Sequence, residues 1–494
     1  MPTSTSRSVS AAFCFSLLVM LGGCGRAPPA RGHLRAALRD PGGSGIIISN
    51  GLRTDWLTEN ALSKDPVANA ALTQNALSTA TFDPATGTEA LRYALHDPAA
   101  GMFFRYLVEC ALSPGQGVEW QDPFDPSAEP LKTEGLAGLC PEWESGPFPV
   151  GRACEERVSA CILARNNAMG VHVEISVRGE DASAPRRFSL GDTVPVAAWR
   201  TYSQQPVESF NACAPGVPGG LASDCGWEAS NVGRCAPGSP VRLGAGGQAP
   251  DQCGVGSILG GEKGSPRLRV CEGLAGCDSR SGRLLAASDG SCGTRAPAVT
   301  FTCPVTGTYS AMVSFPGGPG LGVAMLASER NDFPATEPQV FALREGAFFG
   351  TLFDPSALGG VEVRVTEKGK IVRGKLEGPE KAAAYDRMYS CYAPEWTEPL
   401  AYAEARLCTL RGAWACAAKS VGPCATRGSE AGVCNTEDGA QVQGDGDFEG
   451  CADLEGVVHT EVITTYLNQP CDVVYSQPPD SSAVQGEPLC KRSF

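Results

Sequence analysis

The chain has few of the residues that most enzyme active sites need. Its 494 residues include only four histidines: His33, His96, His172 and His459. It has no G-x-S-x-G, H-E-x-x-H, P-loop or G-x-G-x-x-G sequence, the usual motifs of a hydrolase nucleophile, a zinc centre or a nucleotide site. We therefore expect a protein that is not an enzyme. The alternative is a hydrolase whose catalytic groups meet only in the fold, and His459 is the histidine to test for it.

Basic residues are also scarce. The chain has 40 Lys and Arg against 54 Asp and Glu, which gives a formal net charge of −14. Nucleic acids and anionic membrane surfaces both favour proteins with clustered Lys and Arg. We therefore expect no nucleic-acid partner.

Long hydrophobic runs are limited to one, at residues 11–21, which is too short to cross a bilayer but long enough for a signal peptide. The run ends in Leu21-Gly22-Gly23-Cys24, which resembles the lipobox of bacterial lipoproteins. The resemblance implies cleavage before Cys24, a lipid on its sulfur and membrane contact through that lipid. A retained membrane helix is the alternative. Because Gly25 follows Cys24, the resemblance to Gram-negative lipoproteins implies an exported protein in the cell outer membrane.

Close cysteine pairs of the zinc-binding type, C-x2-C, are absent. Setting aside Cys14, in the signal peptide, and Cys24 leaves 20 of the 22 cysteines, spread from Cys110 to Cys490. An even number in an exported chain favours disulfides, up to ten of them, over a metal site. The 60 Gly and 38 Pro indicate long loops that such disulfides would hold. The sequence leaves the pairing open.

The composition along the chain predicts an α+β protein of several domains, with an N-terminal helical region, a central antiparallel β-sandwich and a disulfide-rich C-terminal module. Residues 1–23 are the lipoprotein signal peptide, and residues 24–45, biased towards Pro and Gly, are a flexible tether. Residues 46–205 form a helical, cystine-containing module with a β-hairpin. Residues 206–330 form a Gly- and Cys-rich β-sandwich, and residues 331–494 a hairpin plus the disulfide-rich module.

Helices are expected in the first module. Asp65-Pro66 and Asp97-Pro98 each offer a side-chain N-cap and a proline suited to the first helical turn. The second of these opens a helix that ends near residue 113. Another helix is expected over residues 153–165, where Cys154 and Cys161 are seven positions apart and therefore roughly 10.5 Å apart along the axis. One disulfide cannot span that distance, so each cysteine must bond elsewhere.

Strand patterns follow this helix. Residues 171–177 alternate between apolar and polar side chains, which predicts a half-buried strand with His172 on the exposed face. Further strands are expected at 268–271 and 284–286. Residues 299–303 and 308–313, joined by a turn, predict an antiparallel hairpin. The order of these strands, with Gly307-Thr308-Tyr309 after the turn, resembles the bacterial pre-peptidase C-terminal β-sandwich over residues 265–315.

In the last module, residues 361–365 and 371–373 predict a second hairpin, and a helix is expected between Pro379 and Cys391. Several short motifs recur in one family. The lipobox, the Asn-Ala-Leu repeats at 60–62 and 75–77, Cys-Pro-Glu-Trp at 140–143, Phe-Thr-Cys-Pro at 301–304 and the segment 466–472 resemble a group of uncharacterised cysteine-rich lipoproteins from myxobacteria. That resemblance implies lineage and location, and no activity.

One acidic loop is a candidate cation site. Asp445, Asp447 and Glu449 stand at alternate positions before Gly450, as in the first half of an EF-hand calcium loop. Gly456 stands where the EF-hand has its last carboxylate ligand. We therefore expect no obligatory cofactor, with calcium as the one ion to test; the alternative is a solvated acidic turn.

A non-catalytic role in binding or adhesion at the cell envelope fits these features best. Its partner would be a glycan or another envelope protein, and Trp143, Trp227 and Trp396 are candidate binding residues if they line an exposed cleft. The alternatives are the motif-free hydrolase and a purely structural envelope component.

Overall fold

The computed structural model describes residues 46–82, 88–121, 127, 130–168, 173–179, 227–244, 267–274, 283–290, 297–315, 318–319, 331–333, 335, 337–354, 361–365, 371–373, 382–393, 402–409, 415–425, 432–435 and 447–468. All of them lie within one compact unit, His33–Phe494. The predicted signal peptide, Cys24 and the tether fall outside the described residues. Among those described, no helix is long and apolar enough to cross a bilayer.

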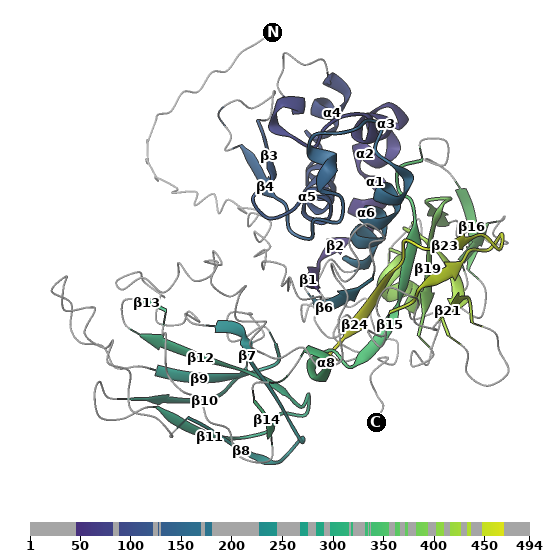
Figure 1. Ribbon diagram of the computed structural model, residues 1–494. Coiled ribbons are helices and arrows are strands. Elements are labelled where there is room, and N and C mark those ends of the chain that lie inside the picture. The colour runs from purple at the N-terminus through teal and green to yellow at the C-terminus, as the bar shows by residue number, and fades with distance from the viewer. Residues whose placement is uncertain are drawn as a thin grey trace, which may run out of the picture. The chain divides into compact units, whose positions relative to one another are not determined.

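The N-terminal region is helical, as predicted (Figure 1). Its helices are α1 (Thr54–Glu59), α2 (Ala61–Lys64), α3 (Pro66–Gln74), α4 (Glu89–Ala94), α5 (Pro98–Ala111) and α6 (Arg152–Ala164), with short helical turns at η1 (Thr79–Phe82) and η3 (Pro141–Glu144). Both predicted N-caps are confirmed, since Asp65 accepts from Val67 N and Asp97 from Ala99 N, each at 2.9 Å. The second oxygen of Asp97 accepts from Ala61 N at 2.9 Å, so one carboxylate joins two helix starts.

Two disulfides hold α6 to its surroundings. Cys154, near the start of the helix, bonds Cys140, and Cys161, near its end, bonds Cys110 in α5. The prediction that the two cysteines of α6 have different partners is confirmed. The helix is buried along most of its length from Arg157 to Ala164 and packs against β15 and β24 of the main sheet.

The main sheet has the strand order β1 (Ile46–Asn50), β6 (Val173–Arg178), β24 (Ile463–Leu467), β15 (Leu343–Gly350), β19 (Met388–Tyr392) and β20 (Lys419–Pro423). Neighbours are antiparallel except β19 and β20, which are parallel. The sheet therefore joins strands of segments 46–205 and 331–494, although the composition predicts that these segments form separate modules. Two short pairs, β2 (Leu52–Arg53) with β5 (Asn166–Asn167) and β3 (Gly117–Trp120) with β4 (Leu131–Glu134), lie beside the helices.

The prediction that β6 is half-buried is wrong. Ser176 and Arg178, expected on the exposed face, are buried like Ile175 and Val177. Arg178 is covered because its guanidinium stacks 3.5 Å from the ring centroid of Tyr466 on β24. His172 falls outside the described residues.

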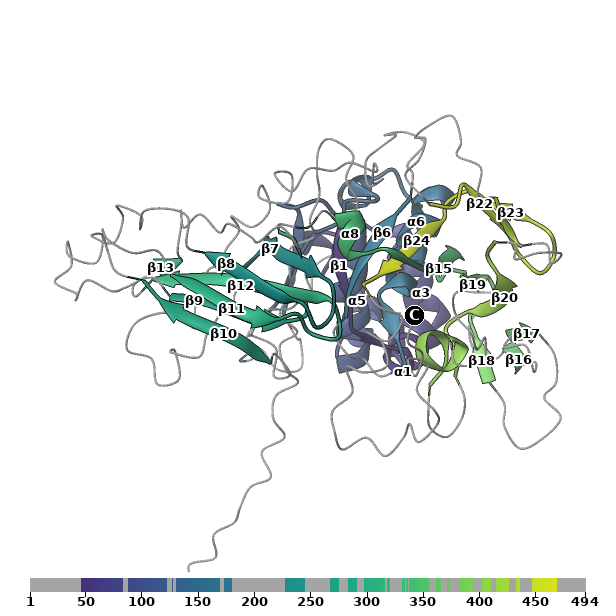
Figure 2. The ribbon, with the colours of Figure 1, turned by 90° about the horizontal axis from the view of Figure 1, so that it is seen from below.

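The central region contains a second sheet, with the order β10 (Leu284–Asp289), β9 (Arg267–Glu272), β12 (Thr308–Phe315), β7 (Trp227–Cys235) and β14 (Asn331–Asp332), and β13 (Gly318–Pro319) beside β12 (Figure 2). A separate antiparallel pair is formed by β8 (Pro240–Gly244) and β11 (Ala298–Thr302). Apolar side chains from both groups of strands, including Val241, Phe301 and Tyr309, share one core.

The predicted hairpin of residues 299–303 and 308–313 is wrong. β11 pairs with β8, whereas β12 pairs with β7 and β9, so the turn at 304–307 carries the chain from one sheet to the other. Phe301 and Tyr309 meet edge to face across the core, with ring centroids 5.0 Å apart. The Cys235–Cys303 disulfide fastens β7 to the end of β11 beside this turn.

The C-terminal region forms two small sheets, β17 (Ile371–Arg373)–β16 (Val361–Val365)–β18 (Ala382–Ala384) and β21 (Cys434–Asn435)–β22 (Gly450–Ala452)–β23 (Val458–His459). The predicted hairpin of 361–365 with 371–373 is confirmed. The helix expected before Cys391 is wrong, because β18 and β19 occupy that segment. Each residue of β19 is buried, so the segment lacks the alternation by which a half-buried strand is recognised. Short helical segments α8 (Glu337–Val340) and η9 (Ala403–Leu407) complete the described chain. The protein is thus a mixed α+β fold with several disulfides towards its C-terminus.

Candidate functional site

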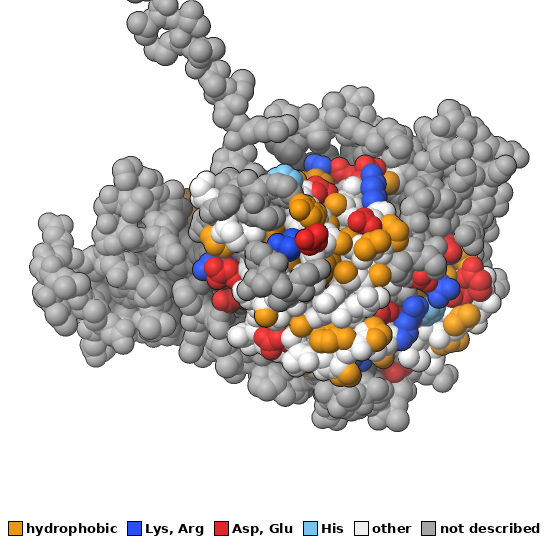
Figure 3. Space-filling model, turned by 90° about the horizontal axis from the view of Figure 1, so that it is seen from above, with side chains coloured by type: hydrophobic (Ala, Val, Ile, Leu, Met, Phe, Trp, Pro, Cys, Tyr) orange, Lys and Arg blue, Asp and Glu red, His pale blue; other side chains and the backbone are white. Residues whose placement is uncertain are grey.

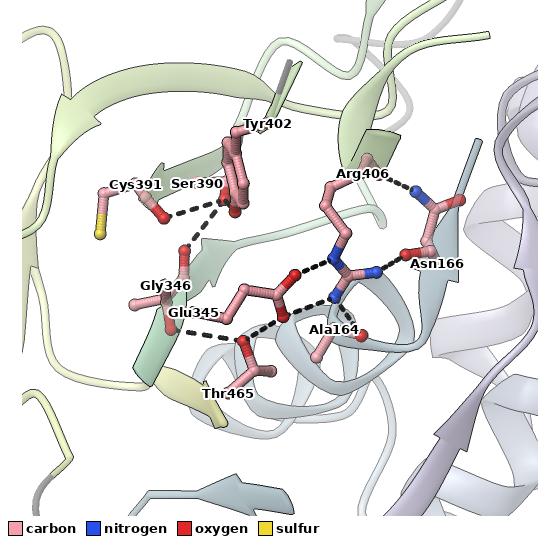
Figure 4. Close-up of polar contacts among 10 residues, drawn as sticks. Ala164, Asn166, Glu345, Gly346, Ser390, Cys391, Tyr402, Arg406 and Thr465 are labelled. Atoms are coloured by element: carbon pink, nitrogen blue, oxygen red, sulfur yellow. Dashed lines mark hydrogen bonds and ion pairs between the residues drawn. The ribbon is translucent and has the colours of Figure 1, made fainter. Parts of the chain in front are cut away.

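Clusters of charged side chains lie at both ends of α6. At the C-terminal end, Glu345 of β15 and Arg406 of η9 form an ion pair in which both side chains are 0% exposed (Figure 4). Arg406 Nε lies 2.5 Å from Glu345 Oε1, and Arg406 Nη2 lies 3.2 Å from Oε2. The two parallel contacts give the bidentate geometry that arginine and carboxylate prefer.

Further hydrogen bonds surround this pair. Arg406 donates from Nη2 to Ala164 O at 2.8 Å and from Nη1 to Asn166 O, while Thr465 Oγ1 donates to Glu345 Oε2 at 2.8 Å. Asn166 in turn donates to Arg406 O at 2.5 Å. We call these five residues, Ala164, Asn166, Glu345, Arg406 and Thr465, the Glu345–Arg406 network. It places a guanidinium on the last carbonyls of α6, where a helix dipole favours positive charge.

A second buried ion pair lies beside the same helix end. Arg165, the C-cap residue of α6, donates from Nη2 to Glu109 Oε2 of α5 at 2.6 Å, with both side chains almost fully buried. Arg105 approaches the other oxygen of Glu109 at 3.1 Å, and the Arg165 guanidinium stacks 4.1 Å from the ring centroid of Tyr106. Burial raises the pKa of Tyr106 despite the nearby arginines. Both ion pairs therefore connect α6 to elements distant in sequence and present no group to solvent.

At the N-terminal end of α6, the side chain of His459 lies between two carboxylates. Its Nε2 is 3.1 Å from Asp453 Oδ2, and its Nδ1 is 3.7 Å from Glu156 Oε1 of α6. The side chain of His459 is 10% exposed. Burial lowers the pKa of His459, but attraction to Glu156 and Asp453 outweighs it, so the pKa is raised. We call Glu156, Asp453 and His459 the His459 cluster.

Aromatic and acidic side chains surround the His459 cluster. The rings of Phe349 and Tyr389 lie with centroids 5.4 and 5.6 Å from that of His459. Burial raises the pKa of Glu155, next to the cluster on α6, to about 7, with Arg152 opposing the shift and Glu156 and Asp354 adding to it. For Glu156, hydrogen bonding from His459 and Arg152 outweighs burial and lowers the pKa.

The geometry of the His459 cluster differs from that of a catalytic triad. In a triad, one imidazole nitrogen faces a carboxylate and the other faces the nucleophile. In the protein both nitrogens of His459 face carboxylates, which stabilise the imidazolium and leave neither nitrogen directed at a hydroxyl. The cluster therefore acts as an ion-pair link between α6 and the β22–β23 turn.

The candidate binding residue Trp143 proves to be a core residue. It is 0% exposed, donates from Nε1 to Leu72 O at 3.1 Å and packs edge to face on Phe353. Trp143 therefore does not meet the condition for a binding residue, exposure in a cleft, and its large apolar side chain instead packs in the core. Trp227 lies in β7 with its side chain outside the described residues, and Trp396 falls outside them altogether.

The acidic loop is described only in part. Asp445 falls outside the described residues, while Asp447 is buried and Glu449 is half-buried just before β22. Within the described segments, three potential ligand atoms come together only at Cys391, Cys434 and Cys451 and at Cys140, Glu142 and Cys154. Calcium binding by Asp445, Asp447 and Glu449 stays a prediction.

All the described cysteines are disulfide-bonded, as predicted. Six complete bridges are Cys110–Cys161, Cys140–Cys154, Cys235–Cys303, Cys391–Cys424, Cys408–Cys416 and Cys434–Cys451, and Cys271 is bonded as well. The disulfides indicate an oxidising, exported environment.

No family model, curated protein or solved structure matches the chain. The resemblances to myxobacterial lipoproteins and to the pre-peptidase C-terminal sandwich therefore depend on the sequence motifs alone.

Sequence reasoning missed the Glu345–Arg406 network and the His459 cluster's partners. The pairs are 61, 303 and 6 residues apart in sequence, between Glu345 and Arg406, Glu156 and His459, and Asp453 and His459. The only local signal is Glu345 itself, a charge at the start of the buried run 345–350. A charge in such a place requires a partner, but its identity depends on the topology of the sheet.

Proposed function

We propose that the protein is an outer-membrane lipoprotein, anchored through Cys24, that binds a glycan or another envelope protein without catalysing a reaction. The observation that carries the proposal is that the charged side chains of both polar clusters are paired with one another. Both nitrogens of His459 face carboxylates, and Glu345 and Arg406 are 0% exposed. Side chains that are already paired in this way support the fold and are not available to a substrate.

The central strands support a binding role, since recognition surfaces are commonly built from loops on a rigid scaffold. The turn between β11 and β12 is such a loop, fastened by the Cys235–Cys303 disulfide at its base. Val305, at its tip, is 91% exposed. On the face in Figure 3, which lies over the N-terminal helical region, the described acidic and basic side chains are interspersed with hydrophobic ones.

Two alternatives have weaker support. A hydrolase needs a base near a nucleophile, and His459 is the described histidine closest to such a role, although its carboxylate neighbours favour the protonated form. A purely structural component would need the paired clusters but no exposed loop. The exposed Val305 favours binding over the structural role.

Parallel measurements of hydrolysis and binding test the proposal. The exported body without its lipid would be assayed against a panel of peptides, esters and polysaccharides, and on glycan arrays and immobilised envelope proteins. We expect saturable binding that weakens when Val305 is changed to Asp, and no turnover. Turnover that His459→Gln abolishes, with no saturable binding, would replace the proposal with the hydrolase.

The anchor and the ion have separate tests. Cys24→Ser should remove the lipid mass and the detergent partitioning of the wild type; a wild type that partitions like the variant contradicts the anchor.

Calcium at Asp445, Asp447 and Glu449 should raise the melting temperature, because an ion that binds only the folded form stabilises it. An identical melting curve in chelator and in roughly 5–10 mM calcium, the range of weak extracellular sites, removes the ion from the proposal.

A further inference from the structure

Four cysteines lie on neighbouring segments at the β20 side of the main sheet. Cys391 is in β19, Cys424 directly follows β20, Cys434 begins β21 and Cys451 lies in β22. Hydrogen bonds join these segments in order: Cys424 N donates to Tyr392 O and Cys434 N donates to Cys424 O, both at 2.8 Å. Cys434 and Cys451 then stand directly opposite each other in antiparallel register. The topology thus aligns the Cys391–Cys424 and Cys434–Cys451 disulfides side by side.

The two disulfides are in contact. The sulfur of Cys434 lies 3.2 Å from the sulfur of Cys391, and the sulfurs of Cys391, Cys434 and Cys451 all lie within 4.8 Å of one another. Cys434 is half-buried, whereas Cys391, Cys424 and Cys451 are buried. A soluble thiol can therefore approach Cys434 most easily, and the next sulfur beyond Cys434 belongs to the second disulfide.

From this arrangement we propose that the four cysteines form a thiol–disulfide exchange site whose substrate is an external dithiol. A thiolate of the dithiol attacks Cys434, the Cys434–Cys451 bond breaks, and Cys451 leaves as a thiolate that takes up a proton. The second thiol of the dithiol then attacks the mixed disulfide, so the dithiol leaves as its own disulfide and Cys434 becomes a thiolate.

The contact with Cys391 determines the next step. The Cys434 thiolate attacks Cys391, a Cys391–Cys434 bond forms, and the Cys391–Cys424 bond breaks with Cys424 as the leaving thiolate. One dithiol is oxidised and one protein disulfide is reduced in total. The product holds one disulfide, Cys391–Cys434, and thiols at Cys424 and Cys451.

Exchange changes which strands are cross-linked. In the oxidised protein, Cys434–Cys451 joins β21 to β22 and Cys391–Cys424 joins β19 to the end of β20. In the product, β21 is joined to β19 and β22 has no cross-link. Because Cys451 pairs with His459 of β23 in the same sheet, release of β22 loosens the segment that carries Asp453 and His459. The site therefore makes this turn responsive to the redox state of its surroundings.

Stepwise reduction of the folded full chain tests the proposal. Dithiothreitol would be added in small portions, free thiols alkylated with N-ethylmaleimide in acid, and cross-linked peptides identified by mass spectrometry. When the four-cysteine exchange site is reduced, we expect alkyl groups on Cys424 and Cys451. The Cys391–Cys424 cross-link should be lost and a Cys391–Cys434 cross-link gained.

Two variants serve as controls. In the Cys391→Ser, Cys424→Ser double variant the acceptor disulfide is gone, so reduction should leave thiols on both Cys434 and Cys451. In the Cys408→Ser, Cys416→Ser double variant, which removes a disulfide elsewhere, the exchange product should form as in the wild type. Alkylation of Cys434 and Cys451 with Cys391–Cys424 intact in the wild type would overturn the proposal, as would a cluster that is reduced only after the protein unfolds.

Discussion

The two ends of α6 use charge in opposite ways. At the C-terminal end, the Glu345–Arg406 network and the Arg165–Glu109 pair are almost fully buried, and each charge has several hydrogen-bond partners. At the N-terminal end, the His459 cluster is partly exposed and its groups have shifted pKa values. Removal of one charge at the buried end leaves its partner buried and unpaired, whereas the groups of the His459 cluster titrate with shifted pKa values. The same helix thus has one end that is fixed and one end that responds to pH.

The largest expected effect comes from breaking the buried end. Arg406→Met leaves the Glu345 carboxylate buried without its cation and removes the donors to Ala164 O and Asn166 O. We expect a loss of about 3–5 kcal/mol in the free energy of unfolding, measured by chemical denaturation. Lys132→Met, which breaks an exposed pair with Glu119, is the control and should cost less than about 1 kcal/mol.

A double variant separates the ion pair from general packing. Glu345→Met with Arg406→Met removes both charges, so it should cost clearly less than the sum of the single changes, because no unpaired buried charge remains. Additive costs would show that the two charges do not depend on each other.

The stabilities contributed by the disulfides at the two ends of α6 can also be compared. Cys110–Cys161 closes a chain separation of 51 residues near the C-terminal end, and Cys140–Cys154 closes one of 14 residues near the N-terminal end. Replacing both cysteines of either bridge by Ser should cost roughly 2–4 kcal/mol, with the longer loop costing about 1 kcal/mol more. The measurement is the denaturation midpoint of each double variant. A larger loss for Cys140–Cys154 would mean that native contacts at the N-terminal end, rather than loop closure, dominate.

Local sequence patterns were sufficient for some of these elements but not for the sites. The Asp-Pro caps and the separate partners of Cys154 and Cys161 follow from geometry within one helix, and both are confirmed. The pairing of β11 and β12 could not be predicted from local patterns, because the two strands are adjacent in sequence yet belong to different sheets. The alternation in β6 predicted an exposed face, but on that face the Tyr466 ring stacks on Arg178. Long-range neighbours leave no local trace, which is why Glu345–Arg406 and the His459 cluster emerged only from the fold.

The His459 cluster should make stability depend on pH. Because attraction to Glu156 and Asp453 raises the pKa of His459 in the folded protein, its stabilisation is fully present below the unfolded pKa, about 6.5. It is lost as the pH rises through the folded pKa. For the carboxylates, whose folded pKa values are lowered, stabilisation is lost as the pH falls through those lower values.

His459→Gln should remove the decline in melting temperature above pH 6.5, with an effect of at most about 1 kcal/mol because the cluster is partly exposed. Melting temperatures from pH 4 to pH 9 measure this, and His96→Gln, at an exposed position, is the control. A decline of equal size in the His459→Gln variant would assign the pH dependence to other groups.

A separate pH effect is expected from Glu155, which stands beside the His459 cluster in the first turn of α6. Burial, with the charges of Glu156 and Asp354, raises the pKa of Glu155 to about 7 in the folded protein, against the attraction of Arg152. Between about pH 4.5 and 7 the folded state therefore binds more protons at Glu155 than the unfolded state does, so stability falls as the pH rises through this window.

Glu155→Gln removes a charge that is unfavourable above pH 7 and should melt at a higher temperature than the wild type at pH 8, but at the same temperature near pH 4. Glu89→Gln, in the first turn of α4, changes a similar charge at a helix start away from the cluster and is the matched control. If Glu155→Gln destabilises the protein equally at both pH values, the carboxylate contributes through hydrogen bonding or the helix dipole, and the N-terminal end of α6 is less responsive to pH than the His459 cluster alone implies.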